Sequence, residues 1–317
     1  VYEKLGDVRE RAVTMGKIAD VLQERGDLVD ALRIRQEEEL PVYEKLGNVR
    51  ERAVTMGKIA DILQARGELE EALRIRREEE LPVYEKLGDV RSRAVTMGKI
   101  ADVLQARGNL EEALRIRREE LLPVFEKLGD VRARTLTMGQ IADVLQARGD
   151  VDEVLRIRRE EELPVYEKLG DVRSRAVTMG RIADVLQARE DLEVALRIRR
   201  EEELPVYEKL GDVRERAVTM GKIADILQAR GELEEALRIR REEELPVYEK
   251  LGDVRELLVG RANLAITLQQ CGRAEDRAEI ERLLRLAHAD ALRLGLPEAR
   301  QIEGIFERFL GMKIGRG

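Results

Sequence analysis

Three observations on this sequence predict an all-α fold, a right-handed α-solenoid of stacked antiparallel helix pairs. A 41-residue segment recurs along most of the chain, and a fixed period of this length is typical of stacked repeat architectures. Each copy contains two segments with apolar residues at spacings of three and four, the pattern of amphipathic helices. Aromatic residues make up only 3% of the chain and good helix formers are abundant, which disfavours strands.

The repeat is clearest in the segment VYEKLG, which begins at Val1 and returns every 41 residues. Its further copies begin at Val42, Val83, Val124 (as VFEKLG), Val165, Val206 and Val247. We expect the repeat array to span residues 1–272, with a truncated first repeat. The last copy diverges, and residues 273–317 are expected to form capping helices, because the terminal repeats of a solenoid must cover an open core.

In the unit that starts at Gly47, we call the two expected helices helix A and helix B. Asn48 is the expected N-cap of helix A, and Arg66 and Gly67 are expected to end it. Its apolar side is predicted at Val49, Ala53, Met56, Ala60 and Leu63.

Helix B is expected to begin near Glu68 and to end at Gly88. Its apolar side is predicted at Leu69, Ala72, Leu73, Leu81, Val83, Tyr84 and Leu87. Pro82 lies inside this pattern and removes one backbone donor, so helix B should kink there or split into two segments.

Residues 56–73, MGKIADILQARGELEEAL, resemble the tetratricopeptide repeat motif. Its signature positions fall at Met56, Ile59, Ala60, Leu63, Gly67, Leu69 and Ala72. The 41-residue unit is longer than the common form and is similar to the repeats of kinesin light chains and of the sensor arrays of bacterial STAND-type ATPases. The resemblance implies a helical solenoid whose helices A line a concave face, and a role in binding proteins or peptides without a cofactor.

Composition excludes several other function classes. The net charge of −7 is a small difference between 58 basic and 65 acidic residues, which are interleaved, so no basic stripe for nucleic acid is present. No stretch has the length and apolarity of a membrane span, and no signal peptide opens the chain. With a single cysteine, an internal disulfide is impossible. We expect a cytoplasmic protein.

Candidates for catalysis are few. His288 has no partner residues that would make a metal site or a nucleophilic pair, and Cys271 is expected to be a small packed residue. The Gly57-Lys58 pair lacks the other residues of a phosphate-binding loop. The Glu78–Glu80 run is expected to be a solvated flank that pairs with neighbouring arginines, reaching Arg91 and Arg93 of the next helix A. The tyrosine of each repeat is interpreted as core, and no enzyme activity is expected.

A partner is expected to bind helix A, on the residues that face away from the core. These candidate residues are Lys17, Asp20, Lys58, Asp61, Lys99, Asp102, Asp143, Arg181, Asp184, Lys222 and Asp225, with Gln140 at the lysine position of one copy. Two interpretations stay open: the lysines and aspartates bind a partner, or they pair three residues apart and keep the face soluble.

The glycine inside helix A, from Gly16 through Gly221 to Gly260, indicates close helix packing or close approach of a ligand backbone. The near identity of the copies has three open explanations, namely recent duplication, a partner that is itself repetitive or broad, or an engineered sequence. Because the chain opens at Val1 in the second half of a helix B, we expect it to be a piece of a longer protein, with an uncapped apolar end that could self-associate.

Overall fold

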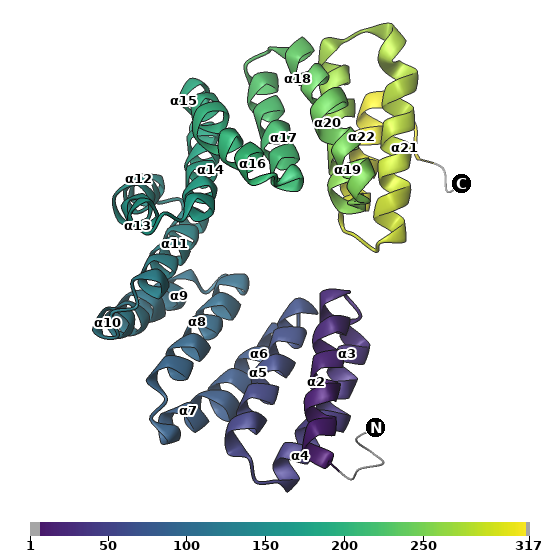
Figure 1. The fold of residues 1–317 in the computed structure, drawn as a ribbon. Helices are drawn as coiled ribbons and strands as arrows, with labels where there is room; N and C mark the ends of the chain where they lie inside the picture. Colours follow the sequence, from purple (N-terminus) through teal and green to yellow (C-terminus); the bar gives the residue numbers. More distant parts are fainter. Residues whose placement is uncertain (1–6, 315–317) are drawn as a thin grey trace. The chain divides into compact units, whose positions relative to one another are not determined.

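The computed structural model describes residues 7–314, so predictions about Val1 and its neighbours lie outside the described residues. Within that range the chain forms helices joined by short turns, with no strand. It divides into two compact units, Val1–Glu162 and Leu163–Gly317, which are described separately (Figure 1).

The N-terminal unit alternates helices A and B as predicted. Its helices A are α2 (Val8–Glu24), α5 (Val49–Ala65), α8 (Val90–Ala106) and α11 (Val131–Arg148). Its helices B are α3–η1–α4 (Leu28–Ile34, Arg35–Glu39, Leu40–Lys45), α6–η2–α7 (Leu69–Ile75, Arg76–Glu80, Leu81–Leu87), α9–η3–α10 (Leu110–Arg115, Ile116–Leu121, Leu122–Lys127) and α12–η4 (Val151–Arg156, Ile157–Glu162). Each η segment named here is a π-helical turn.

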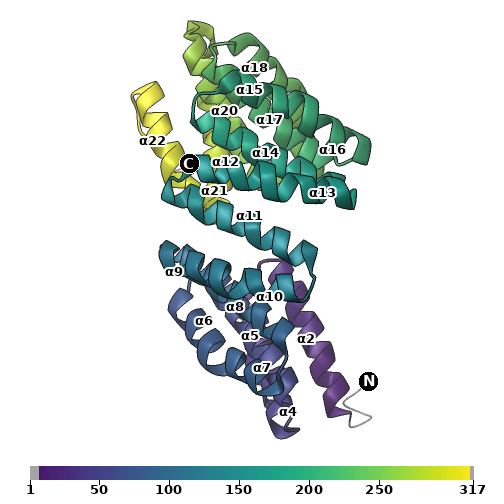
Figure 2. The same ribbon diagram turned by 90° about the vertical axis from the view of Figure 1, so that its left-hand side faces the viewer.

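The C-terminal unit continues the same alternation. Its helices A are α14 (Val172–Ala188), α17 (Val213–Ala229) and α20 (Val254–Cys271), and its helices B are α13 (Leu163–Leu169), α15–η5–α16 (Leu192–Ile198, Arg199–Glu203, Leu204–Leu210) and α18–η6–α19 (Leu233–Ile239, Arg240–Glu244, Leu245–Leu251). A 3₁₀ turn, η7 (Ala274–Asp276), leads to α21 (Arg277–Arg293) and α22 (Glu298–Leu310). In both units a helix A packs between the helix B before it and the helix B after it (Figure 2).

The predicted helix ends are confirmed. The Asn48 side chain accepts a hydrogen bond from the Glu51 backbone N–H at 3.3 Å, which satisfies one free donor of the first turn. Gly67 follows helix A with φ +82°, a left-handed conformation that glycine adopts without strain. Glu190 occupies the equivalent position in another copy at φ +66°, and it is the one residue other than glycine with a positive φ among residues 7–314.

The proline of helix B produces a π-helical turn. The backbone N–H of Leu81 donates to the carbonyl of Arg76, five residues back, instead of the usual four. Widening the helix by one residue just before Pro82 accommodates a residue that has no N–H and whose ring would strike the preceding turn. The prediction of a kink or a split at the proline is therefore refined to an α–π–α helix.

The predicted apolar sides are mostly confirmed. Ala53, Met56, Ala60 and Leu63 on helix A and Ala72, Leu73 and Tyr84 on helix B are buried. Val49 and Leu87 were wrongly assigned to the apolar sides, since they are 55% and 52% exposed. Each lies at a helix end beside a turn, where the neighbouring helices no longer cover it.

The C-terminal helices lie where the sequence predicts them. In α22, Ile302, Phe306 and Leu310 are buried, while Ile305 and Phe309 are partly buried against the same core as α20 and α21. This packing agrees with a capping role for residues 273–317, which remains a proposal. None of the helices among residues 7–314 is long and apolar enough to cross a membrane.

Candidate functional site

A stripe of partly exposed residues runs along each helix A from α2 to α17, at positions four and three residues apart. In α5 it comprises Val54, Lys58 and Asp61, and we call this set and its equivalents the helix A stripe. Val54 is 39% exposed, and the side chains of Lys58 and Asp61 are 42% and 25% exposed. Spacings of four and three residues place side chains on one face of a helix, so the stripe forms a single surface.

Behind each stripe lies an arginine of helix B that is buried in the stack. Arg76 is 0% exposed and donates through Nη2 to the Asp61 carboxylate at 2.5 Å. Equivalent bonds join Arg35 to Asp20, Arg117 to Asp102, Arg158 to Asp143, Arg199 to Asp184 and Arg240 to Asp225. A buried guanidinium requires such a partner, because an unpaired charge in the core is strongly unfavourable.

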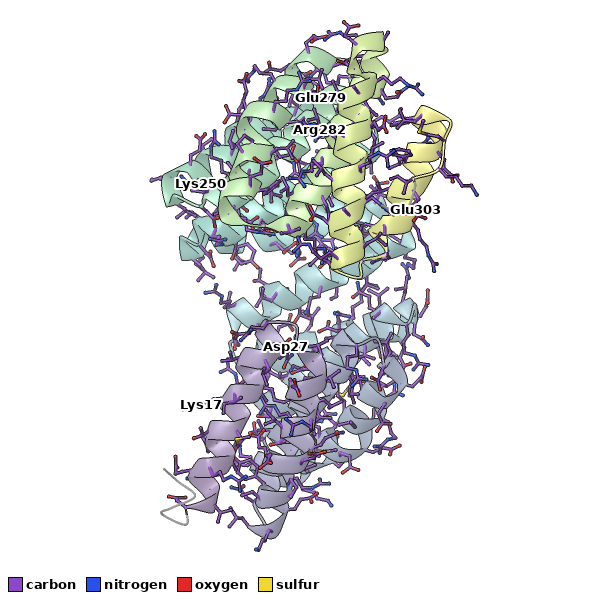
Figure 3. All side chains as sticks on the ribbon, turned by 90° about the vertical axis from the view of Figure 1, so that its right-hand side faces the viewer. Lys17, Asp27, Lys250, Glu279, Arg282 and Glu303 are labelled. Atoms are coloured by element: carbon purple, nitrogen blue, oxygen red, sulfur yellow. The ribbon has the colours of Figure 1, made fainter. Side chains whose placement is uncertain are left out.

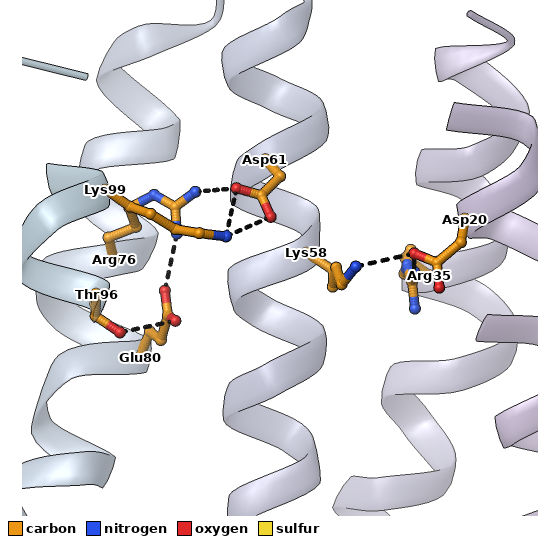
Figure 4. A network of polar contacts seen from close by, with 8 residues as sticks. All are labelled: Asp20, Arg35, Lys58, Asp61, Arg76, Glu80, Thr96 and Lys99. Carbon is orange, nitrogen blue, oxygen red and sulfur yellow. Dashed lines mark hydrogen bonds and ion pairs between the residues drawn. The ribbon is translucent and has the colours of Figure 1, made fainter. Parts of the chain in front are cut away.

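The other end of the guanidinium binds a buried glutamate. Nη1 of Arg76 donates to Glu80 Oε2 at 3.1 Å, and the other carboxylate oxygen accepts from the Thr96 hydroxyl of the next helix A at 2.9 Å (Figure 4). Glu80 is 6% exposed. Arg76 and Glu80 are the first and last residues of the π-helical turn. The turn that precedes Pro82 therefore also carries the buried ion pair.

The glycine of helix A makes room for this glutamate. A Cβ atom on Gly57 would lie 2.7 Å from Glu80 Oε1, closer than side chains approach each other. A Cβ atom on the equivalent glycines would likewise lie 2.5–2.7 Å from Oε1 of the equivalent glutamate, at Gly16, Gly139, Gly180 and Gly221. Of the two interpretations, close packing is therefore what the structure shows.

The inclusion of Gly260 in this glycine series was wrong. In the 41-residue register Gly260 is equivalent to Thr219, and Ala262 is equivalent to Gly221.

The lysines of the stripe pair between repeats. Lys58 Nζ binds Asp20 of the preceding repeat at 3.0 Å and Lys99 Nζ binds Asp61 at 2.7 Å (Figure 4). In the C-terminal unit, Lys222 lies 3.6 Å from Asp184. The alternative of pairing three residues apart within one helix is therefore wrong for these lysines. Lys17, in the first described helix A, is exposed (Figure 3).

Burial raises the pKa of three glutamate carboxyl groups in the buried network. It raises the pKa of Glu80 and of Glu203, and it raises the pKa of Glu244 to about 7, against the lowering effect of the paired arginines. The tyrosine beside each glutamate follows the same rule: burial raises the pKa of Tyr207 to about 12. Tyr43 and its equivalents are 2–5% exposed, and Phe125 is 7% exposed, so their interpretation as core is confirmed.

One junction between helix pairs departs from this pattern. Leu121 stands where the other copies have the buried glutamate, and Gln140 stands where the next helix A has lysine. Nη1 of Arg117 consequently has no hydrogen-bond partner, although Arg117 is 1% exposed; its Nε also lacks one, as does Nε of Arg76. The Thr137 hydroxyl donates to the carbonyl of Ala133 in its own helix. We call this place, between α8 and α11, the Leu121 junction.

The Leu121 junction contains a hollow of about 220 Å³. It is lined from α8 by Ala94, Val95, Gly98, Lys99 and Asp102, from helix B by Leu121 and Phe125, and from α11 by Ala133, Leu136, Thr137 and Gln140. A Cβ atom on Gly98 would have Leu121 Cδ1 at 3.6 Å, an ordinary contact. The glycine is thus present here without the carboxylate that it accommodates elsewhere.

The prediction for the glutamate run is correct only in part. Glu78 is exposed and pairs with Arg74 at 3.3 Å, as expected of a solvated flank, whereas Glu80 and Arg76 are buried. Glu79 pairs with Arg52 of its own repeat at 2.9 Å. The arginines expected to receive this run bind elsewhere, since Arg91 pairs with Asp130 and Arg93 with Glu85.

The buried network was missed by sequence reasoning, although a signal was present. Arg76 follows Ala72 by four residues and Leu73 by three, and Glu80 follows Arg76 by four. Both charged residues therefore fall on the apolar side of helix B, where a repeated charge pair indicates a buried ion pair.

His288 and Cys271, whose side chains could take part in chemistry, lie in surroundings that serve the packing of the helices. His288 is 7% exposed, and its Nε2 lies 2.9 Å from Oε1 of Glu303, which comes from α22 (Figure 3). Burial raises the pKa of the Cys271 thiol, which makes it less reactive at neutral pH. Among residues 7–314, no cluster of three histidine, cysteine or acidic residues could hold a metal ion.

The sequence matches no protein-family model and no curated protein sequence. Solved structures do match. The putative kinesin light chain TPR-like repeats of Podospora anserina share 20% identity with a TM-score of 0.51, over 64% of this chain and 96% of that one. The STAND protein with a tetratricopeptide repeat sensor from Pyrococcus horikoshii shares 18% identity with a TM-score of 0.66, over 95% of this chain but 45% of that one.

A bacterial protein shows the same arrangement. The quorum sensor NprR from B. thuringiensis shares 15% identity with a TM-score of 0.63, over 90% of this chain and 80% of that one. At these identities the similarity concerns the fold. Together with the 41-residue helix pairs, it shows that the chain is an all-α solenoid of tetratricopeptide-like repeats.

Proposed function

We propose that the chain is a non-catalytic interaction scaffold that binds a protein or peptide partner on the helix A stripe. The observation that carries the proposal is the exposed apolar residue at the head of four of the stripes, between the inter-repeat ion pairs. Val54, Val95, Leu136 and Val177 are 38–53% exposed. Within the N-terminal unit, Val54, Val95 and Leu136 make a row of apolar residues flanked by charges, which suits a segment of protein with mixed side chains.

The candidate residues contribute unequally to this proposal. The aspartates hold the buried arginines in place, so their main contribution is to the position of the stripe. The lysines, with Arg181 at their position in α14, border the apolar residues and are proposed to contact the partner. Neither nucleic acid nor a membrane is a proposed partner, and self-association through the N-terminal end remains a second proposal.

The test uses a random heptapeptide library displayed on phage and selected against the whole chain. Enriched peptides are then measured by calorimetry against a stripe variant, Val54→Ser, Val95→Ser, Leu136→Ser and Val177→Ser. A matched control carries serine at Leu87, Leu128, Leu210 and Leu251, which are 46–52% exposed at the ends of helices B. We expect the stripe variant to lose the peptides and the control to keep them. Peptides kept by both variants contradict the proposed face.

A second candidate function is effector sensing within a larger STAND-type ATPase or protease. It is favoured by the match to the Pyrococcus STAND protein with a tetratricopeptide repeat sensor, which covers 95% of this chain and 45% of that protein. Sequencing of the coding region upstream of Val1 tests it. An ATPase or protease domain in frame supports the sensor role, and a start codon without such a domain removes it.

A further inference from the structure

The Leu121 junction differs from its neighbours by a pair of exchanges that together remove one anion and one cation. Glutamate is replaced by Leu121, and the lysine of the next helix A is replaced by Gln140. Because the two exchanges balance in charge, the junction remains neutral in sum. It has lost the two groups that fill and bridge the other junctions.

The first exchange replaces a buried carboxylate with an apolar side chain that lines a hollow. In the preceding junction the carboxylate of Glu80 lies against Gly57 and accepts from Thr96, so the space between the two helices A is occupied. At the Leu121 junction the apolar side chain of Leu121 lies in that place, with Cδ1 3.6 Å from the position of a Cβ on Gly98, and a hollow of about 220 Å³ lies beside it. An apolar cavity of roughly 150 Å³ is large enough to take benzene, so this hollow can hold a leucine, methionine or phenylalanine side chain.

The second exchange leaves a carboxylate without its ammonium partner. Asp20, Asp61 and Asp184 each pair with a lysine of the next helix A. Asp102 lines the hollow, its side chain is 40% exposed, and the residue opposite is the neutral Gln140. Asp102 is bound by Arg117 on its buried side, so its open side faces the hollow.

We propose that the Leu121 junction is the specific anchor point for a partner, and that it takes an aliphatic side chain of a peptide segment whose neighbouring lysine or arginine binds Asp102. The partner supplies both groups that this junction lacks, apolar volume at Leu121 and a cation at Asp102. This inference rests on the proposed scaffold function and adds to it a position and a ligand chemistry.

The junction also answers a difficulty posed by near-identical repeats. A row of identical stripes offers the same contacts at every step and cannot fix the register of a bound segment. One junction with a hollow and an open carboxylate provides a single reference point. The other stripes then add contacts along the segment without choosing its position.

The test is a titration of the whole chain with the peptide acetyl-Gly-Leu-Lys-Gly-amide, followed by NMR of methyl groups on Leu121, Leu136 and Val95. The matched peptides replace Leu with Ala, or Lys with the uncharged norleucine. We expect the parent peptide to shift these methyl signals and each replacement to weaken the Kd at least about tenfold. Absence of shifts with the parent peptide at millimolar concentration overturns the proposal, as does an equal Kd for either replacement.

A matched variant restores the sequence of the other repeats. Leu121→Glu with Gln140→Lys fills the hollow and pairs Asp102, and we expect at least a tenfold loss of peptide affinity with an unchanged helical circular dichroism spectrum. If this variant does not fold, Ala133→Met fills the hollow from α11 and is expected to give the same loss. The converse variant, Glu203→Leu with Lys222→Gln, should create a second peptide site between α14 and α17.

The outcomes separate this inference from the scaffold function. Phage-selected peptides that are lost by the stripe variant but bind equally well to Leu121→Glu with Gln140→Lys overturn the anchor point and leave the scaffold function standing. Peptides that are kept by both variants overturn both.

Discussion

The junction after Glu80 and the junction at Leu121 are built from almost the same residues, yet they differ in what they hold. At the first, Arg76 is bound on two sides, by Asp61 and Glu80, and Gly57 accommodates the carboxylate. At the second, Arg117 keeps only the aspartate side of that arrangement, and Leu121 takes the place of the glutamate beside a hollow. The comparison shows that the buried ion pair fills the space between the helices at the first junction, and that the apolar side chain of Leu121 leaves one end of the arginine without a partner at the second.

The largest expected difference between the junctions concerns their arginines. Arg76→Leu leaves the buried carboxylate of Glu80 without a cation, so we expect a loss of about 3–5 kcal/mol in the free energy of unfolding. Arg117→Leu leaves only Asp102 without its arginine, and Asp102 is in contact with water. The free energy of unfolding should therefore fall by about 1–2 kcal/mol. Urea titrations of both variants measure this. Equal losses would contradict the difference between the junctions, and the exposed Arg74→Leu serves as a control that should change little.

The second prediction uses pH. Burial raises the pKa of Glu244 to about 7, above the value of 4.5 expected in the unfolded chain. A carboxyl whose pKa is higher when folded binds its proton more tightly in the folded state, so the free energy of unfolding should fall as the pH rises from about 4.5 to 7. The contribution is on the order of 3 kcal/mol. Glu244→Gln should remove it, while the neighbouring Glu242→Gln should not.

Urea titrations of the wild type and the two glutamine variants at several pH values measure this contribution. The comparison is between slopes, because other carboxyl groups titrate in the same range. If Glu244→Gln leaves the slope of the wild type unchanged, Glu244 is ionised in the folded chain and the account of its burial is wrong.

The glycines provide a third comparison, in which the sign of the effect changes. Alanine is favoured over glycine in a helix by about 1 kcal/mol. At Gly98 the added methyl meets an ordinary contact, so Gly98→Ala should stabilise the chain by up to about 1 kcal/mol. At Gly57 it would meet Glu80 at 2.7 Å, so Gly57→Ala should destabilise it by about 1–2 kcal/mol after the gain is subtracted. Thermal unfolding of the two variants checks this, and stabilisation by both would remove the proposed role of Gly57.

The smallest effect is expected from the inter-repeat ion pairs. Lys99→Gln gives the preceding junction the glutamine that the Leu121 junction has at Gln140, and it removes the ion pair between Lys99 and Asp61. Both side chains are partly hydrated, so the cost should be about 0–1 kcal/mol and should shrink at high salt. A larger or salt-independent loss in urea titrations would show that these pairs support the stack more than their exposure suggests.

The helix pairs could be predicted from the sequence because period, caps and glycines act locally. Asn48 and Gly67 specify helix ends through their own backbone geometry, and they lie where expected. The π-helical turn could not be predicted, because Pro82 permits a kink, a break or a widened turn, and packing against the neighbouring helices selects among them. The partners of Lys58 and Lys99 could not be predicted either, because they lie in a neighbouring repeat and depend on how the helices stack.

The Leu121 junction shows a further limit of sequence reasoning. The exchange of glutamate for Leu121 is visible in the sequence as one difference among many. Its importance depends on knowing that the glutamate is buried and that the facing Gly98 has no Cβ atom to fill the space. Only the structure supplies both facts.

The most direct test of the account is a double-mutant cycle at the Leu121 junction itself. The free energy lost on changing Arg117→Leu is measured by urea unfolding, once in the wild type and once in the Leu121→Glu background. If Leu121 is what leaves Nη1 of Arg117 without a partner, the loss should be larger in the Leu121→Glu background by at least about 2 kcal/mol, because a buried carboxylate then depends on the guanidinium. Equal losses in the two backgrounds would mean that residue 121 does not face Arg117, and the distinction between the two junctions would fail.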